Sequence, residues 1–182
     1  MRLFIGIPVC PTPELGQACR ALQRSHPGIR LVPPENWHVT LRFLGEMEEA
    51  NLVIDAMRLA VEGVARFSLS IRGVGAFPEA RCARVAWAGI DSERISRVEE
   101  KLRFATRELG SPPERRPFSP HLTLARLQPA ENISDWVEKL RNRLFHRTVV
   151  EELVLYRSEL GARSPVYIRE AVGQLRRAWQ GG

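Results

Sequence analysis

Cysteine and long hydrophobic runs are both scarce in this chain. Its three cysteines, Cys10, Cys19 and Cys82, are odd in number and form no Cys-x-x-Cys pair. Scattered thiols of this kind are typical of a reducing compartment, so we expect a cytoplasmic protein and rank a Cys10–Cys19 disulfide as the weaker alternative. No apolar run approaches the roughly 18 residues that a membrane-spanning helix needs. Prolines interrupt the apolar start of the chain, which predicts a first strand, no signal peptide and no membrane partner.

Acidic residues are outnumbered by basic ones. The 182 residues include 27 lysines and arginines against 21 aspartates and glutamates, a net charge of +6. A basic protein favours an anionic partner, for which nucleic acid is the most common candidate, although a solvated basic surface accounts for the charge equally well. Hydrophobic residues make up 44% of the chain, enough for the core of one domain of this length.

Two short segments of the chain are nearly identical. Trp37–Leu41 and Pro120–Leu124 each place a histidine and a threonine two residues apart inside an apolar run. Alternate side chains of a β-strand point to opposite faces, so the histidine and the threonine share one face and the aliphatic residues share the other. The motif residues are His38 with Thr40 and His121 with Thr123. The sequence therefore predicts two imidazoles and two hydroxyls that line one cleft.

The elements expected around these motifs occur twice in the same order, as strand, helix, motif strand, helix, strand. In the first half we expect strand 2–9, helix 13–25 with Thr12 as its N-cap, the motif strand to 44, helix 48–66 and strand 67–74. In the second half we expect strand 84–90, helix 92–109, the second motif strand, helix 133–144 and strand 148–158, and then an additional strand over 166–172. A proline-rich loop, Ser111–Pro120, precedes the second motif, and Trp179 lies in the tail.

The predicted fold class is α+β, with one bilobal domain over residues 1–182 and an internal repeat at about 1–80 and 81–175. We expect two pseudo-symmetric lobes, each with an antiparallel-rich sheet and outer helices, and a central cleft that the motif strands flank.

The two histidines suit acid–base catalysis without a metal. Imidazole titrates near pH 6.5, so one neutral ring can take a proton from an attacking water while a protonated ring gives one to the departing oxygen. The threonine hydroxyls can donate to the remaining oxygens of a tetrahedral anion. A phosphodiester is the substrate that such a symmetric arrangement serves best.

Two other kinds of catalytic site are disfavoured. Zinc sites use three or four N, S or O ligands, and neither motif has a cysteine or carboxylate at ligand spacing. No Gly-x-Ser-x-Gly nucleophile elbow occurs in the chain either. We therefore expect no metal, no cofactor and no stable protein partner.

The segments Asn36–Glu46 and Phe118–Arg126 resemble the twin signatures of the two-histidine phosphoesterase superfamily. Within it they are most similar to the RNA 2′,3′-cyclic phosphodiesterases, also named 2′-5′ RNA ligases, and Arg2–Ile7 and Leu155–Ser158 fit the same group. The resemblance implies metal-independent opening of a terminal 2′,3′-cyclic phosphate to a 2′-phosphate, and joining of RNA ends through a 2′-5′ linkage as the reverse reaction. It also implies that RNA ends or nucleotides with a cyclic phosphate are the partners.

The resemblance carries over to individual residues. His38 and His121 become the acid–base pair, with His38 as the acid for the 3′ oxygen and His121 as the base for water. Thr40 and Thr123 become phosphate ligands, and so does Arg126.

Strict alternation along the strands conflicts with one of these roles. It places Arg42 on the face of His38 but Arg126 on the face opposite His121, so Arg126 reaches the site only if its strand ends or bulges first. We retain both arginines and favour Arg126. Phe43 and Phe118 flank the motifs and are candidates for stacking on a base, although a place in the core suits them equally well.

Two other functions remain open. A basic module that binds RNA ends without turnover would need phosphate donors but no proton shuttle, so the intact histidines argue against it. A cyclic phosphodiesterase for a small nucleotide, such as ADP-ribose 1″,2″-cyclic phosphate, would use the same chemistry and the same motifs.

Overall fold

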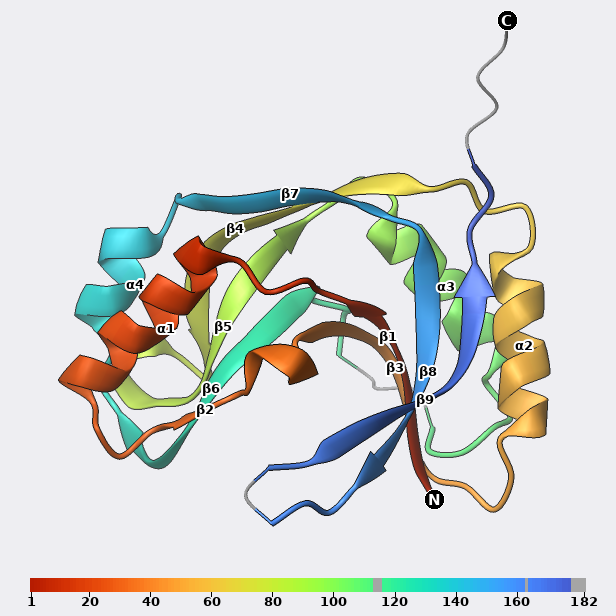
Figure 1. Ribbon diagram of the computed structural model, residues 1–182, viewed down its shortest axis with the longest axis horizontal. Helices are drawn as coiled ribbons and strands as arrows, with labels where there is room; N and C mark the ends of the chain where they lie inside the picture. Colours follow the sequence, from red (N-terminus) through yellow and green to blue (C-terminus); the bar gives the residue numbers. More distant parts are fainter. Residues whose placement is uncertain (113–115, 163, 178–182) are drawn as a thin grey trace, which may run out of the picture.

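The protein folds into a nine-stranded sheet covered by four α-helices in the part of the chain that the structure describes (Figure 1). This computed structural model describes residues 1–112, 116–162 and 164–177. Its strands are β1 (Arg2–Pro8), β2 (Arg30–Leu31), β3 (His38–Glu46), β4 (Phe67–Phe77), β5 (Ala83–Asp91), β6 (His121–Glu131), β7 (Leu144–Val150), β8 (Glu152–Glu159) and β9 (Val166–Gln174). Its helices are α1 (Pro13–Ser25), α2 (Asn51–Val61), α3 (Ile95–Ala105) and α4 (Ser134–Leu140).

The sheet is antiparallel and continuous, with the strand order β7-β4-β5-β6-β3-β1-β8-β9 and β2 added beside β6. The two motif strands, β3 and β6, lie at its centre and pair at Val39 and Leu122. The sheet curls around this line, so its two halves form two lobes (Figure 1). The predicted α+β class and bilobal arrangement are confirmed.

The lobes do not coincide with the two halves of the sequence. One lobe, here the β1 lobe, contains β3, β1, β8 and β9 with α2 and α3, whereas the other, the β5 lobe, contains β6, β5, β4 and β7 with α1 and α4 (Figure 1). The helix that follows β1 thus packs on the β5 lobe, where the Trp136 indole donates to the carbonyl of Ala18. Helix α3, which follows β5, packs on the β1 lobe. The element order repeats along the chain, but each lobe is built from both repeats.

Local sequence accounts for most of the elements. Thr12 caps α1 with its hydroxyl, which accepts from the Leu15 amide at 3.4 Å, and Pro13 opens the helix as expected. Helix α1 has the expected range, whereas α2, α3 and α4 are shorter than expected, and the expected strand 148–158 is two strands, β7 and β8, that separate at Glu151. Residues 113–115 of the proline-rich loop and Trp179 lie outside the described residues.

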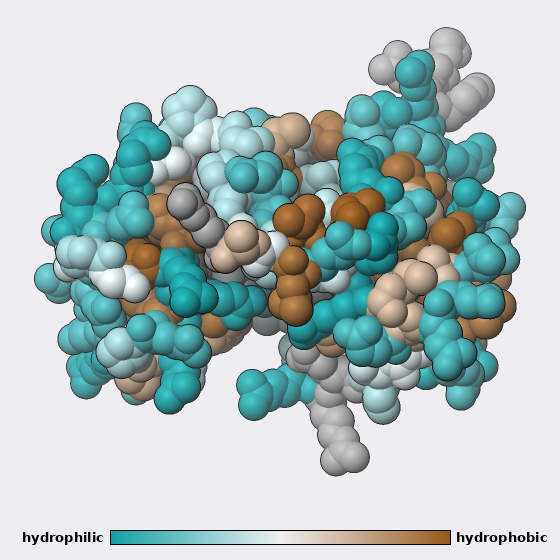
Figure 2. All heavy atoms as spheres, turned by 60° about the horizontal axis from the view of Figure 1, so that its bottom comes forward, coloured by the Kyte–Doolittle hydropathy of each residue, from teal (hydrophilic) through white to brown (hydrophobic). Residues whose placement is uncertain are grey.

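Space-filling shows how the side chains are distributed over the two lobes. On the face of Figure 2, hydrophilic side chains cover most of both lobes, and hydrophobic ones gather near the middle. In the described ranges, no helix is both long enough and apolar enough to cross a membrane.

Candidate active site

Both motif strands have a β-bulge directly after the motif threonine. In β3, Gly6 of β1 pairs with Thr40 and Ile5 pairs with Arg42, so Leu41 is the additional residue. In β6, Trp87 of β5 pairs with Thr123 and Ala86 pairs with Ala125, so Leu124 is the additional residue. The two repeats therefore share the same irregularity at the same position, which supports their common local design.

Each bulge reverses the faces of the residues that follow it. Arg42 and Ala125 turn to the buried side, whereas Phe43 and Arg126 turn to the side of the histidines and threonines. The bulge thus removes the conflict over Arg126, which lines the pocket beside Thr123. After the bulge in β3, Phe43 occupies the position that Arg126 occupies after the bulge in β6.

The expectation that Arg42 contacts substrate is wrong. Its side chain is 5% exposed and does not line the pocket. The guanidinium donates to the Thr106 hydroxyl at 3.1 Å and to the carbonyls of Leu109 and Ser111 at 3.3 and 2.7 Å. Burial lowers the pKa of Arg42, and the nearby Glu99 carboxylate acts in the opposite direction. Arg42 therefore fastens the end of α3, and the loop after it, to β3.

The pairing of β3 with β6 brings the two motifs together. Because Val39 pairs with Leu122 in an antiparallel register, Thr123 is the neighbour of His38 across the strands and His121 is the neighbour of Thr40. Side chains opposite each other on such strands have Cβ atoms about 4.5–5.5 Å apart where the strands stay paired. Here the pairing is limited to Val39 and Leu122, and three of the four motif side chains, His38, Thr40 and Thr123, line one pocket.

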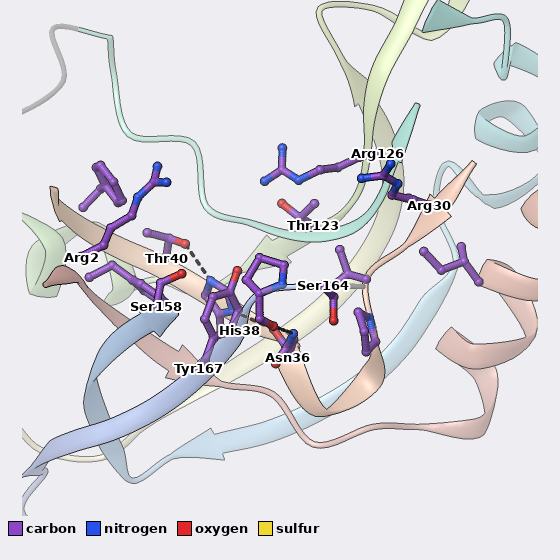
Figure 3. Close-up of a pocket in the computed structure, with 16 residues that line it drawn as sticks. Arg2, Arg30, Asn36, His38, Thr40, Thr123, Arg126, Ser158, Ser164 and Tyr167 are labelled. Carbon is purple, nitrogen blue, oxygen red and sulfur yellow. Dashed lines mark hydrogen bonds between the residues drawn. The ribbon is translucent and has the colours of Figure 1, made fainter. Parts of the chain in front are cut away.

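The two histidines have the same orientation. His38 Nδ1 lies 2.8 Å from the carbonyl oxygen of Asn36, and His121 Nδ1 lies 2.8 Å from the carbonyl oxygen of Ser119. A carbonyl only accepts, so each Nδ1 carries a proton and each neutral ring presents the lone pair of Nε2. His38 Nε2 lies 3.1 Å from the Thr40 hydroxyl, which donates to it in the neutral state (Figure 3). Both rings are therefore set to exchange a proton at Nε2.

Aromatic side chains surround His38. Its ring centre lies 4.7 Å from that of Phe4, 5.2 Å from that of Tyr167 and 5.9 Å from that of Tyr156. The resulting loss of water lowers the pKa of His38 below its usual 6.5, and the charge of His121 lowers it further, whereas the hydrogen bond to Asn36 opposes both. The neutral form of His38 is therefore favoured in the free protein.

His121 has a more open environment. Phe77 meets it edge to face at 5.1 Å, and Trp87 lies 6.4 Å away between ring centres. It stands outside the pocket that holds His38, but its charge acts on the pKa of His38. The second imidazole thus borders the same site from the side of the β5 lobe.

The pocket has a volume of about 450 Å³ and reaches beyond the motifs in two directions. At one end, the Arg2 guanidinium lies over the Phe43 ring, 5.0 Å from its centre. At the other end, Arg30 and Arg126 lie together, and Figure 3 shows Arg126 extending over Thr123. The residues at its floor and rim include Phe4, Asn36, Ser158, Ser164, Pro165 and Tyr167.

Sequence reasoning missed several of these residues. Arg30 and Tyr167 belong to no motif, and Arg2 lies in the Arg2–Ile7 segment but is not among the predicted site residues. Long-range strand pairing brings all three to the pocket. Phe118, a candidate for base stacking, instead packs partly buried against the core and does not line the pocket. Between residues 1 and 177, leaving out 113–115 and 163, no three histidine, cysteine, aspartate or glutamate side chains are grouped as metal ligands.

A curled antiparallel sheet that presents two His-x-Thr strands to one cleft defines the two-histidine class of phosphoesterases. The model of the 2′-5′ RNA ligase superfamily matches residues 11–162, and the chain belongs to this superfamily.

Named relatives and solved structures agree with this assignment. The chain is 35% identical to the RNA 2′,3′-cyclic phosphodiesterase of Thermus thermophilus, with 92% of this chain and 86% of that protein covered. It is 34% identical to the protein of the same name from Methanothermobacter thermautotrophicus, with 76% and 78% covered. A crystal structure of a Thermus thermophilus protein has a TM-score of 0.80 at 33% identity, with 97% and 99% covered. Apo LigT from E. coli has a TM-score of 0.70 at 26% identity, with 96% of each chain covered.

Proposed function

We propose that this protein hydrolyses the 2′,3′-cyclic phosphate at RNA ends to a 2′-phosphate, with His38 and His121 as a metal-independent acid–base pair. The observation that carries the proposal is the shared orientation of the two rings, each with Nδ1 held by a backbone carbonyl, so that Nε2 is the nitrogen left for proton transfer. The names of the relatives support the same activity. A structure of E. coli LigT in complex with 3′-AMP supports the binding of a nucleotide.

In the proposed reaction, water attacks the phosphorus and the bond from phosphorus to O3′ breaks. His121 Nε2 takes the proton of the attacking water, and His38 Nε2 gives a proton to O3′, which leaves as the 3′ hydroxyl. The Thr40 and Thr123 hydroxyls and the Arg126 guanidinium donate to the other phosphate oxygens, where charge accumulates. The phosphate remains on O2′.

The assignment of the acid has to agree with the lowered pKa of His38. An anionic phosphodiester within the pocket favours the protonated ring, so substrate binding raises the pKa of His38 and prepares it as an acid. The more open His121 meets solvent, from which the attacking water comes. If an RNA 5′ hydroxyl replaces this water, the same transfers form a 2′-5′ linkage, which is the proposed ligation.

The test is turnover of nucleoside and oligonucleotide 2′,3′-cyclic phosphates in the presence of EDTA. We expect a 2′-monophosphate product, and we expect His38→Ala and His121→Ala each to lower kcat by about 10²–10⁴-fold while the thermal unfolding profile is preserved. Full activity in either variant would refute the mechanism. Tight binding of the cyclic end without any product would instead identify a binding module, and a strong preference for ADP-ribose 1″,2″-cyclic phosphate would identify a small nucleotide as the substrate.

A further inference from the structure

Two arginines face each other at one end of the pocket. Arg30 of β2 and Arg126 of β6 are direct partners across the two strands, and both line the pocket. Like charges directly opposite each other on neighbouring strands destabilise a sheet. A pair of this kind is therefore explained best by an anion that it binds.

No carboxylate of the described residues compensates this pair. The ion pairs within residues 1–112, 116–162 and 164–177 use other arginines, and neither Arg30 nor Arg126 takes part in one. Both side chains are exposed to solvent at the rim, so a ligand can reach them. The end of the pocket beyond Thr123 is thus a positively charged site without an internal counterion.

The Arg30 side chain lies farther from Thr123 and Thr40 than the Arg126 guanidinium does (Figure 3). The motif strands meet at Leu122, and Arg30 pairs four positions further on, at Arg126. Because the two arginines are opposite each other, they lie equally far along β6 from Leu122, and the direction of each side chain distinguishes them. Arg126 extends back over Thr123 toward the centre of the pocket (Figure 3).

We propose that Arg30 binds a second phosphate, carried on the 5′ oxygen of the ribose whose 2′ and 3′ oxygens hold the reacting phosphate. The proposal rests on the proposed function, because that function places the first phosphate between the motifs. Three kinds of ligand carry a phosphate at this position. They are an RNA end, with its internal diester, a 5′-phosphorylated nucleotide, with its monoester, and an ADP-ribose derivative, with its diphosphate. Arg30 therefore makes the protein prefer a nucleotide that continues beyond its 5′ oxygen.

The test compares ligands with and without the 5′-phosphate by calorimetry, which needs no turnover. Wild-type protein should bind adenosine 2′,5′-bisphosphate about tenfold more tightly than adenosine 2′-monophosphate, as one charge-assisted contact predicts. In Arg30→Gln this difference should fall to twofold or less. Arg58→Gln, which removes the same charge from the remote helix α2, should retain it, and Arg126→Gln should weaken both ligands.

Kinetics then distinguish the sources of the second phosphate. A dinucleotide, a 5′-phosphorylated nucleotide and an ADP-ribose derivative, each with a cyclic phosphate, are compared with a nucleoside 2′,3′-cyclic phosphate. Arg30→Gln should reduce the advantage of the preferred substrate, mainly through KM, since the contact is equal in ground and transition states.

A tenfold difference that persists in Arg30→Gln, or no difference in the wild type, would overturn the assignment of Arg30. Equal losses for both ligands in Arg30→Gln would place this arginine on the reacting phosphate instead. If the wild type binds both ligands as expected but opens no cyclic phosphate, the proposed function fails and the second phosphate site stands.

Discussion

At the scale of single residues, position relative to a bulge decides which arginine can meet an anion. Arg42 and Arg126 both follow a His-x-Thr motif, and alternation favoured the wrong one. The bulge residues Leu41 and Leu124 exist only through the pairing of each motif strand with its neighbour. Residue type and spacing were enough to predict that His38, Thr40 and Thr123 face one pocket, whereas the side that each arginine faces depends on the register of the sheet.

The pKa of His38 gives a prediction at this scale. We expect NMR titration of the free protein to place it below 6.5, and we expect His121→Asn to raise it, because that variant removes a neighbouring positive charge. Between the native pKa of His38 and pH 6.5, this residue is more protonated in the unfolded chain than in the native protein. The contribution of His38 to the free energy of unfolding therefore falls as the pH decreases through this range. Substrate analogues should raise the pKa. A value at or above 6.5 in the free protein would contradict the assigned environment.

Arg42 allows a second residue-scale prediction. Arg42→Ala leaves the carbonyls of Leu109 and Ser111 without this buried donor, so the free energy of unfolding should fall by about 2–4 kcal/mol. Chemical denaturation at neutral pH measures the loss. Arg58→Ala on the exposed face of α2 is the matched control and should change stability by less than about 0.5 kcal/mol. Equal stabilities of the two variants would show that Arg42 does not hold the α3 end.

At the scale of elements, local pattern and long-range pairing contribute differently. The cap and the apolar positions of α1 are local, so its start at Pro13 could be predicted. The end of β7 and the beginning of β8 depend on different partners, β4 and β1, and the sequence between them has no break strong enough to indicate the change. The element order was predictable, but the partners of each element were not.

The bulge in β6 can be tested by moving one arginine. Arg126→Ala should lower kcat/KM for a cyclic phosphate by about 10–10²-fold, because it removes the charged donor that we propose for the phosphate. Adding Ala125→Arg should not restore activity, since Ala125 is fully buried on the other side of the sheet. The double variant should also unfold at lower temperature. Recovery of activity with the arginine at position 125 would show that β6 has no bulge there.

At the scale of the whole molecule, the cleft results from exchange between the repeats. Each lobe takes a helix that follows a strand of the other lobe, so the two motif strands meet at the centre instead of lying within separate halves. The sequence repeat predicted two related units and a shared cleft. It could not predict the exchange, because the repeat is equally compatible with lobes made of consecutive residues.

The distribution of charge over the whole molecule predicts how activity depends on salt. For single-stranded nucleic acid, log K falls with log salt by about 0.7 for each phosphate neutralised. An oligonucleotide end that places phosphates near Arg126, Arg30 and Arg2 should therefore show a steeper salt dependence of kcat/KM than a nucleoside 2′,3′-cyclic phosphate, which carries one phosphate. Arg30→Gln should make the oligonucleotide slope shallower, and Arg58→Gln should leave it unchanged because α2 lies outside the pocket. Equal slopes for both substrates in the wild type would mean that only the reacting phosphate is held, and that the net charge of +6 plays no part in binding the rest of the RNA.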